Sequence, residues 1–284
     1  MREWHIDDGR WETRKPRGKP DALAMFAGYG GTSYLLYDPN RERLMLFLGI
    51  GGGLPFPKRI AVLEWSDATE EWITRYQPPP EPAPDDPWLY GFSVVYSSGK
   101  FLLMGPGLEG NEPTKNIAVW EWDGDWDGQG RWSRRRSLNP KNAPPSRGAA
   151  AFAYDDTSKK IIMFGGSTNV GIVSETWEYD GIGWTEKKES RDPDARWPPE
   201  RTSASMAYDP SRRGVILFGG MDDKGVGLND AWLWDANMET WREVTSTPRL
   251  KGISSAFLVR MARTIALVGG ISGGGPQSDM WELK

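Results

Sequence analysis

The sequence predicts an all-β protein built from repeated units of four antiparallel strands. Three observations support this prediction. Glycine and proline occur 34 and 22 times in 284 residues, and both interrupt long helices. Sixteen tryptophans recur close to short apolar runs. The same order of apolar run, glycine and aromatic segment returns five times along the chain, which indicates a repeat architecture.

The third and fourth copies of the repeat align most clearly. SRGAAAFAYDDTSKKIIMFGG ends at Gly166, and ERTSASMAYDPSRRGVILFGG ends at Gly220. A loop follows each copy, and then an aromatic segment, TWEYDGIGW or AWLWDANMETW. Weaker copies lie on both sides. The glycines that end the apolar runs are spaced by 56, 60, 54 and 50 residues, and they are Gly49, Gly105, Gly165, Gly219 and Gly269.

Each copy reads as four short strands. The first is small and apolar, as in AAAFAY, and a polar turn such as Asp155–Lys159 follows it. The second is a continuous apolar run, as in IIMF or VILF, which predicts burial on both faces. The third alternates, as in Trp177-Glu178-Tyr179, which favours unequal faces. The fourth begins at a tryptophan and becomes charged, as in WTEKK, so we expect a solvated outer edge.

Four antiparallel strands repeated about every 50 residues are typical of a β-propeller. We therefore expect one propeller over residues 1–284. Five blades are favoured, because four copies supply four strands and the fifth supplies three. The expected segments are an N-terminal closing strand within 1–20 and blades at 24–76, 89–136, 146–188, 200–245 and 251–284.

The N-terminus is expected to close the ring. Trp11-Glu12-Thr13-Arg14 has the pattern of an outer strand, so we predict that it pairs with the C-terminal blade and covers its exposed edge. Trp4-His5-Ile6-Asp7 has the pattern of a third strand and complicates this assignment. A six-bladed ring with one incomplete blade is the alternative.

The glycine pair, the loop, the aromatic strand and the spaced tryptophan resemble the kelch repeat. The resemblance covers nearly the whole chain and is strongest in the third and fourth copies. The first two copies depart from it, with Gly49-Ile50-Gly51 and Gly105-Pro106-Gly107 in place of the pair. In physical terms, the glycines allow positive φ and close backbone approach where the second strand ends.

One face of the expected ring carries the long loops, which is where recognition usually occurs on a rigid scaffold. Arg147 and Arg201 lie seven residues before the tyrosine of the first strand, and Lys251 is the comparable residue of the fifth copy. The kelch resemblance implies that such arginines line the channel mouth, where two guanidiniums could grip a carboxylate or phosphate. Alternatively, each arginine bonds loop carbonyls or a neighbouring acid.

Aromatic side chains are expected on the same face. Trp88, Tyr90 and Trp197 lie in the segments that lead into the second and fourth blades. They could stack on a sugar or on an aromatic side chain of a partner. Alternatively, they pack beneath the proline-rich loops.

One short motif resembles a calcium loop. Asp123, Asp125 and Asp127 begin a D-x-D-x-D-G pattern, but its ninth and twelfth positions are Arg131 and Arg134 rather than ligands. An ordinary Asp-Gly turn accounts for most of this stretch.

Composition excludes several classes of protein. The net charge of −4 argues against nucleic-acid binding, and no apolar stretch is long enough to span a membrane. With no cysteine and a single histidine, His5, disulfides, thiol chemistry and multi-histidine metal sites are excluded. We expect no cofactor. The N-terminus lacks the pattern of a signal peptide, so we expect a cytoplasmic protein.

Two functions remain open. The first is a non-catalytic interaction module that binds a protein partner, such as a segment bearing a carboxylate, through the long loops and the arginines. The second is a carbohydrate-binding protein or a sugar-acid isomerase. Kelch-like propellers that resemble sialic-acid mutarotases imply a site in which Arg147 or Arg201 works with an acid such as Glu175 or Asp230. A protein that only assembles with itself is a third reading.

Overall fold

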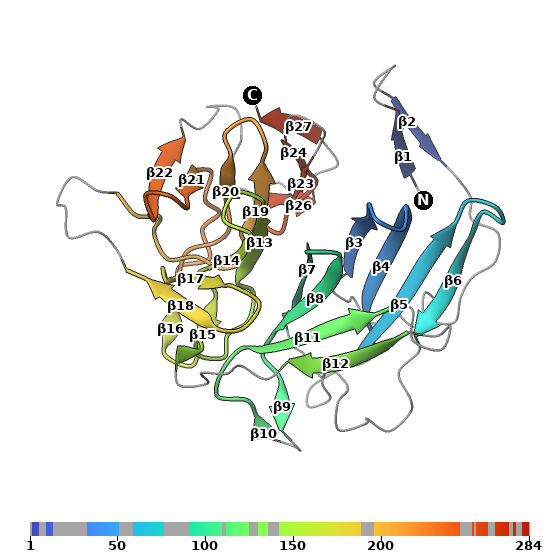
Figure 1. Ribbon diagram of the computed structural model, residues 1–284. Helices are drawn as coiled ribbons and strands as arrows, with labels where there is room; N and C mark the ends of the chain where they lie inside the picture. Colours follow the sequence, from blue (N-terminus) through green and yellow to red (C-terminus); the bar gives the residue numbers. More distant parts are fainter. Residues whose placement is uncertain are drawn as a thin grey trace. The chain divides into compact units, whose positions relative to one another are not determined.

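A computed structural model of the chain describes residues 2–5, 10–13, 33–50, 59–76, 91–109, 112–124, 130–135, 142–188, 196–244, 252, 254–260, 265–272, 275–276 and 280–283. Within these residues the chain is all β, without an α-helix, and the strands form antiparallel sheets (Figure 1). The chain divides into two compact units, Met1–Trp88 with Trp122–Ser133 and Leu89–Glu121 with Arg134–Lys284. The boundary passes through the second sheet.

Four sheets have the four strands that the sequence predicts, joined in chain order, and we call them blades 1 to 4. A fifth sheet, blade 5, has three described strands. Blade 1 is β3 (Ser33–Asp38), β4 (Arg43–Ile50), β5 (Arg59–Ser66) and β6 (Glu71–Tyr76). Blade 2 is β7 (Ser93–Ser97), β8 (Lys100–Gly105), β11 (Ala118–Asp123) and β12 (Arg131–Arg135). Blade 3 is β13 (Ala151–Asp155), β14 (Lys160–Phe164), β17 (Thr176–Tyr179) and β18 (Trp184–Lys187). Blade 4 is β19 (Ser205–Asp209), β20 (Gly214–Phe218), β21 (Ala231–Asp235) and β22 (Thr240–Val244), and blade 5 is β23 (Phe257–Arg260), β24 (Ile265–Val268) and β27 (Met280–Leu283).

The N-terminal strand has a local partner. Strand β2 (Arg10–Thr13) pairs with β1 (Arg2–His5) in a two-stranded sheet, with Trp4 opposite Trp11. A hairpin closes a loop of only a few residues, so it costs little chain entropy. The closing of the ring by this strand against the C-terminal blade stays a prediction, because the two segments belong to different compact units.

Burial follows the predicted order of strands, with one exception. The second strands are the most buried, and β20 is buried at every residue. The fourth strands expose charged residues after a buried tryptophan, as in β18. Strand β17 was predicted to have unequal faces, but all four of its residues are buried. Glu178, the charged residue of β17, can be buried because Lys160 and Lys187 neutralise its carboxylate.

Aromatic side chains fill the space between neighbouring blades. One core cluster joins blade 2 to blade 3 through Met104, Trp177 and Trp184, among others. The next joins blade 3 to blade 4 through Phe164 and Trp241, whose ring centres lie 5.5 Å apart in an edge-to-face arrangement. This geometry is favourable for aromatic pairs. Tryptophans thus help to fill the space between neighbouring blades in this unit.

Backbone hydrogen bonds link the starts of the first strands from blade to blade. The amide of Ser203 donates to the carbonyl of Ala149, and the amide of Ser255 donates to that of Ser203, each at 2.9 Å. All three residues have φ of 53° or 54°, and Gly91 has 59° at the same position of blade 2. A left-handed residue at this point lets each first strand turn and contact its neighbour.

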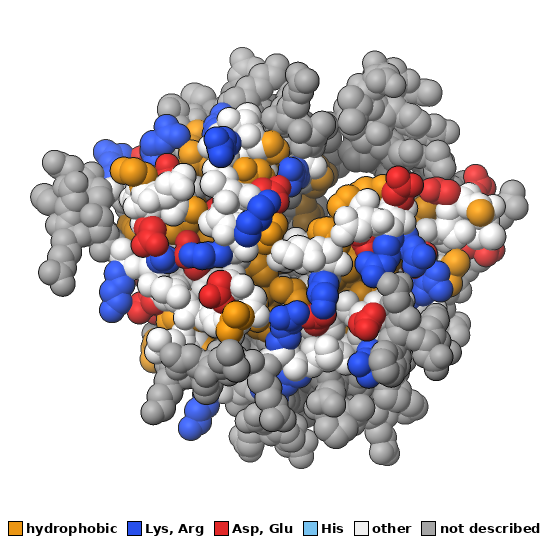
Figure 2. Space-filling view, viewed as in Figure 1, with side chains coloured by type: hydrophobic (Ala, Val, Ile, Leu, Met, Phe, Trp, Pro, Cys, Tyr) orange, Lys and Arg blue, Asp and Glu red, His pale blue; other side chains and the backbone are white. Residues whose placement is uncertain are grey.

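A glutamate recurs in the third strand of blades 1 to 3, buried in blades 1 and 3 and half-buried in blade 2. Glu178 is 2% exposed, and its carboxylate lies 2.7 Å from Lys160 Nζ on the second strand and 3.1 Å from Lys187 Nζ on the fourth. Glu64 and Glu121 have equivalent pairs of cations. On the surface, basic and acidic side chains are interspersed over the described part of the face in Figure 2.

Candidate functional site

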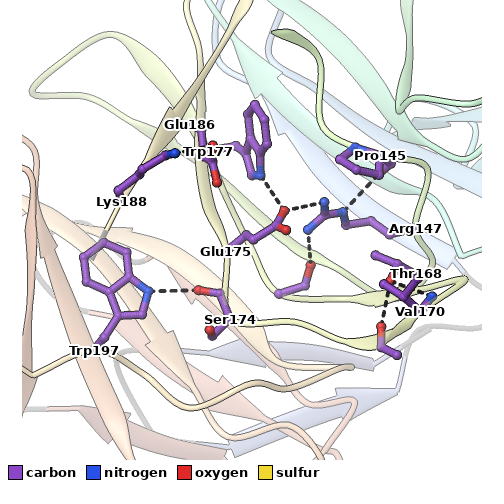
Figure 3. Close-up of polar contacts among 12 residues, drawn as sticks. Pro145, Arg147, Thr168, Val170, Ser174, Glu175, Trp177, Glu186, Lys188 and Trp197 are labelled. Atoms are coloured by element: carbon purple, nitrogen blue, oxygen red, sulfur yellow. Dashed lines mark hydrogen bonds and ion pairs between the residues drawn. The ribbon is translucent and has the colours of Figure 1, made fainter. Parts of the chain in front are cut away.

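The candidate site lies at the ends of the second strands, where the long loops leave blades 3 and 4. Arg147 precedes β13, and its side chain is completely buried. Its Nε donates to the carbonyl of Pro145 at 3.1 Å and its Nη1 to that of Gly165 at 3.2 Å. Its Nη2 donates to Glu175 Oε2 at 2.6 Å (Figure 3). The guanidinium thus ties the start of the first strand to both ends of the loop.

Blade 4 repeats this arrangement. Arg201 is also completely buried, with Nε donating to the carbonyl of Pro199 at 3.0 Å and Nη1 to that of Gly219 at 3.0 Å. Nη1 and Nη2 also donate to the two carboxylate oxygens of Asp230, each at 2.7 Å. A planar guanidinium with several fixed donors suits this task, which a lysine cannot perform equally well.

In each blade a tryptophan also donates to the acid that pairs with the arginine, and we call each set of arginine, acid and tryptophan a cluster. Trp177 Nε1 donates to Glu175 Oε2 at 2.9 Å, and Trp232 Nε1 donates to Asp230 Oδ2 at 2.6 Å. Burial raises the pKa of both carboxyl groups, but hydrogen bonds from the arginine and the indole outweigh it and leave each pKa below its usual value. Both acids are therefore ionised at neutral pH, and neither is suited to act as a general acid there.

The two acids differ in how much of each carboxylate remains available. Both oxygens of Asp230 are bonded to Arg201. Glu175 directs Oε2 to both Arg147 and Trp177, and its Oε1 has no hydrogen-bond partner among the described residues. Glu175 is also the more exposed, at 34% against 21% for Asp230. Glu175 is therefore the acceptor that this cluster presents to solvent.

The glycine pairs allow the close contacts that the clusters need. Gly165 has φ of 69°, and a Cβ placed on it would lie 2.5 Å from the carbonyl oxygen of Arg201 in the next blade. Gly166 has φ of 97°, and a Cβ there would lie 3.1 Å from Cδ of Arg147. Any larger residue would push the arginine or the neighbouring blade away.

The loops beyond the glycine pairs are small hairpins held to their own blades. In blade 3, β15 (Ser167–Thr168) pairs with β16 (Gly171–Ile172), and Ser167 also bridges to Gly148. Blade 2 has β9 (Leu108–Glu109) with β10 (Glu112–Pro113), and blade 5 has β25 (Ile271–Ser272) with β26 (Gly275–Pro276). Their exposed apolar side chains are Val170 at 84%, Val226 at 56% and Ile271 at 51%.

The structure separates the residues that the sequence singled out. Arg147 pairs with Glu175, and Arg201 pairs with Asp230, so the predicted arginine–acid combinations do form. Both guanidiniums point inward, however, and are occupied by the protein itself, which is the alternative that the sequence left open. A direct grip on a ligand carboxylate would require these bonds to break.

The aromatic candidates have varied outcomes. Trp197 is half-buried and donates from Nε1 to the carbonyl of Ser174 at 2.8 Å (Figure 3). It also packs edge-on against Trp234, with ring centres 6.1 Å apart. Trp197 therefore packs against the blade 3 loop that contains Ser174. Trp88 and Tyr90 lie outside the described residues.

Lys251 also lies outside the described residues, but the strand register corrects its assignment. Ser254 bridges to Ile271 as Thr202 bridges to Met221 in blade 4. Since Thr202 directly follows Arg201, the residue that corresponds to the arginine is the one before Ser254, not Lys251. Counting back from a tyrosine fails in blade 5 because its first strand has no tyrosine.

The calcium motif gains no support from the described residues. Asp123 is the last residue of β11, whereas Asp125 and Asp127 lie outside the described part of the chain. Within the described ranges, no three His, Cys, Asp or Glu side chains come together as a metal site would require. In the same ranges, no helix is long and apolar enough to cross a membrane.

Comparison with known proteins extends these observations. The KLHDC2/KLHL20/DRC7 Kelch-repeats domain matches residues 91–284. Adagio-like protein 1 of Oryza sativa subsp. japonica is 27% identical over 196 residues, which are 67% of this chain and 29% of that protein. A tRNA wybutosine-synthesizing protein 4 of Emericella nidulans is 31% identical over 122 residues, 39% of this chain and 11% of that protein. The chain thus spans less than a third of the length of either relative.

The fold has a counterpart among solved structures. The structure titled "Structure of YjhT" covers 87% of this chain and 79% of its own, with a TM-score of 0.61 and 14% sequence identity. At this level of identity the likeness concerns the fold alone.

Proposed function

This chain belongs to the kelch-repeat family of β-propellers, and from that premise we propose that it is a non-catalytic interaction module which binds a protein partner through its loop-bearing face. The observation that carries the proposal is the bracing of the loops. Buried Arg147 and Arg201 hold loops whose tips expose Val170 and Val226. Rigid loops that present apolar side chains lose little conformational entropy on binding.

The arginines have an indirect role in this proposal. Each one fixes the geometry of a loop, and the exposed atoms of the loop contact the partner. The relatives agree with a module of this kind, because the matching segment is a minor part of proteins with unrelated names. The carbohydrate alternative needs an arginine that faces the ligand, and the burial of both guanidiniums favours the interaction module over it.

Loop-tip variants test the proposal without disturbing the blades. Val170→Asp with Val226→Asp places two charges on the loop-bearing face. Ile182→Asp with Met238→Asp is the matched control, because these residues are 58% and 72% exposed in the turns between the third and fourth strands of the same two blades. The measurement is a comparative pull-down from lysate of the source cells, after both variants are shown to melt within about 2 °C of the wild type.

The proposal predicts a protein that the wild type and the Ile182/Met238 control capture, and that the Val170/Val226 variant loses. It would be rejected if all three baits captured the same proteins, or if none captured any. In either case, binding of monosaccharides and small acids would be measured next by calorimetry.

A further inference from the structure

The opposite ends of the first strands carry a second group of polar residues. The penultimate residue of these strands is a tyrosine in blades 1 to 4, Tyr37 being that of blade 1, and the strand register places Arg260 at the same position in blade 5. The pairs that define this position are Tyr96 with Phe101, Tyr154 with Ile161, Tyr208 with Val215 and Arg260 with Ile265.

The tyrosines connect neighbouring blades. Tyr154 Oη lies 3.3 Å from Ser98 Oγ of blade 2, and Tyr208 Oη lies 3.0 Å from Thr157 Oγ1 of blade 3. Arg260 continues the series in a different way. Its Cζ lies 5.3 Å from the ring centre of Tyr208, and its Nη1 donates to Asp156 of blade 3. A cation thus stands where the other blades have a phenol.

Further contacts bring two more cations to this point. Thr157 Oγ1 donates to the carbonyl of Arg213 at 3.0 Å, which places the blade 4 turn beside that of blade 3. Lys159 Nζ lies 3.9 Å from Asp156. We call Asp156, Lys159, Arg213 and Arg260, with the hydroxyls of Thr157 and Tyr208, the turn cluster.

The turn cluster has an excess of positive charge at an accessible surface. Arg260 and Lys159 both lie beside Asp156, and Arg213 belongs to the adjoining turn of blade 4, so these four residues have a formal charge of +2. Arg260 and Lys159 side chains are 52% and 69% exposed, whereas Asp156 is 27% exposed. Arg213 is exposed, and its side chain has no hydrogen bond or ion pair with any residue that the structure describes. Arg260 and Lys159 share one acid and therefore repel one another, and a bound anion would relieve that repulsion.

We propose that the turn cluster binds a phosphate-type oxyanion, either free or on a phosphorylated molecule. A dianion balances the excess of two charges, which a single carboxylate does not. Guanidinium groups match the oxygens of phosphate in geometry. Asp156 competes for the same donors. This site lies at the turns between the first and second strands, away from the loops of the proposed function, and does not depend on it.

Titration calorimetry with inorganic phosphate tests this site, at constant ionic strength in a buffer low in chloride. Arg260→Tyr restores the residue of the other blades and should weaken binding about tenfold or more, as should Arg213→Gln. Asp156→Asn removes the competitor and should strengthen binding several-fold, a gain that misfolding cannot produce. Arg242→Gln, an exposed change on the outer strand β22, is the charge-matched control and should stay within about twofold.

A phosphoserine peptide and its unphosphorylated form identify the source of the oxyanion. Tighter binding of the phosphopeptide than of inorganic phosphate would support a phosphorylated protein as the ligand, and the reverse would support a small phosphate compound. The proposal is overturned if the wild type gives no saturable binding of either probe at millimolar concentration. It is also overturned if Arg242→Gln weakens binding as much as Arg260→Tyr, or if Asp156→Asn fails to strengthen it.

Discussion

Arg201 and Asp230 form a two-pronged ion pair, with Nη1 2.7 Å from Oδ1 and Nη2 2.7 Å from Oδ2, although the arginine side chain is completely buried. The remaining donors of the guanidinium reach two backbone carbonyls. A buried charge is tolerated only with such complete pairing. The pair therefore holds the blade 4 loop in one geometry, and the same design recurs with Glu175 in blade 3.

Removal of the arginine should destabilise the protein strongly. Arg201→Ala leaves Asp230 with the Trp232 indole but without its ion-pair partner, and removes the donor to two carbonyls, so we expect a loss of about 3 kcal/mol in the free energy of unfolding. Urea denaturation followed by tryptophan fluorescence measures it. Arg196→Ala is the control, because that side chain is 74% exposed and its pair with Glu243 should contribute less than about 1 kcal/mol. Equal losses in the two variants would show that the buried pair has no special role.

Stability should fall in acid through Asp230. Burial raises its pKa, but hydrogen bonds from Arg201 and Trp232 outweigh this, so the folded-state pKa is below the unfolded value. Stabilisation from a depressed carboxyl group is complete above the unfolded pKa, about 3.9 for aspartate, and is lost as the pH falls through the folded value. Thermal melts from pH 7 to pH 2.5 should show the wild type and Asp230→Asn differing most at pH 7 and converging in acid. A constant difference would contradict this assignment.

The buried Glu178 should depend on Lys187. The lysine lies 3.1 Å from Glu178 and is only 10% exposed, and its hydrogen bonds to Glu239 and Glu178 raise its pKa despite the opposing effect of burial. Lys187→Ala should cost about 2–3 kcal/mol of unfolding free energy, because it leaves Glu178 with Lys160 alone. The adjacent Lys188→Ala, at an 80% exposed side chain, should change it by less than about 0.5 kcal/mol. Guanidinium denaturation of both variants checks this difference.

Gly165 should not tolerate a methyl group. Gly165→Ala combines a positive φ with a 2.5 Å approach to the carbonyl of Arg201, and it should cost more than about 2 kcal/mol. Gly148→Ala is the control, since a Cβ there meets nothing within 4 Å and its φ is not in the left-handed region. Differential scanning calorimetry should show a clear fall in melting temperature for the first variant only. If both melted like the wild type, the close contact between the blades would be absent in solution.

Much of the fold could be predicted from the sequence because the signals are local. Runs such as VILF predict a buried strand from their own composition, and β20 is buried at every residue. The pairing of Arg147 with Glu175 was also among the predicted combinations. The stacking of Arg260 on Tyr208 was missed, although one signal was visible: blade 5 has an arginine where the four other first strands have a tyrosine.

The local pairing of β2 with β1 was not predicted. Trp11–Arg14 has the composition of an outer strand, but composition does not choose between possible partners, and a near one costs little entropy to reach. The assignment of Lys251 was wrong for a different reason. Lys251 was aligned by counting from a residue type that blade 5 does not have. Only the bridge between Ser254 and Ile271 fixes the register there.

The sequence by itself determined the number and order of strands in each repeat, the glycine turns, and which residue types gather at the loops. These features follow from periodicity, backbone conformation and composition, which act over a few residues. Only the tertiary structure decided that Arg147 and Arg201 point inward and hold the loops, and that Glu175 and the turn cluster face solvent. The direction of a side chain is set by partners far away in the sequence, because a buried charge turns to whichever acceptors the folded chain brings within reach.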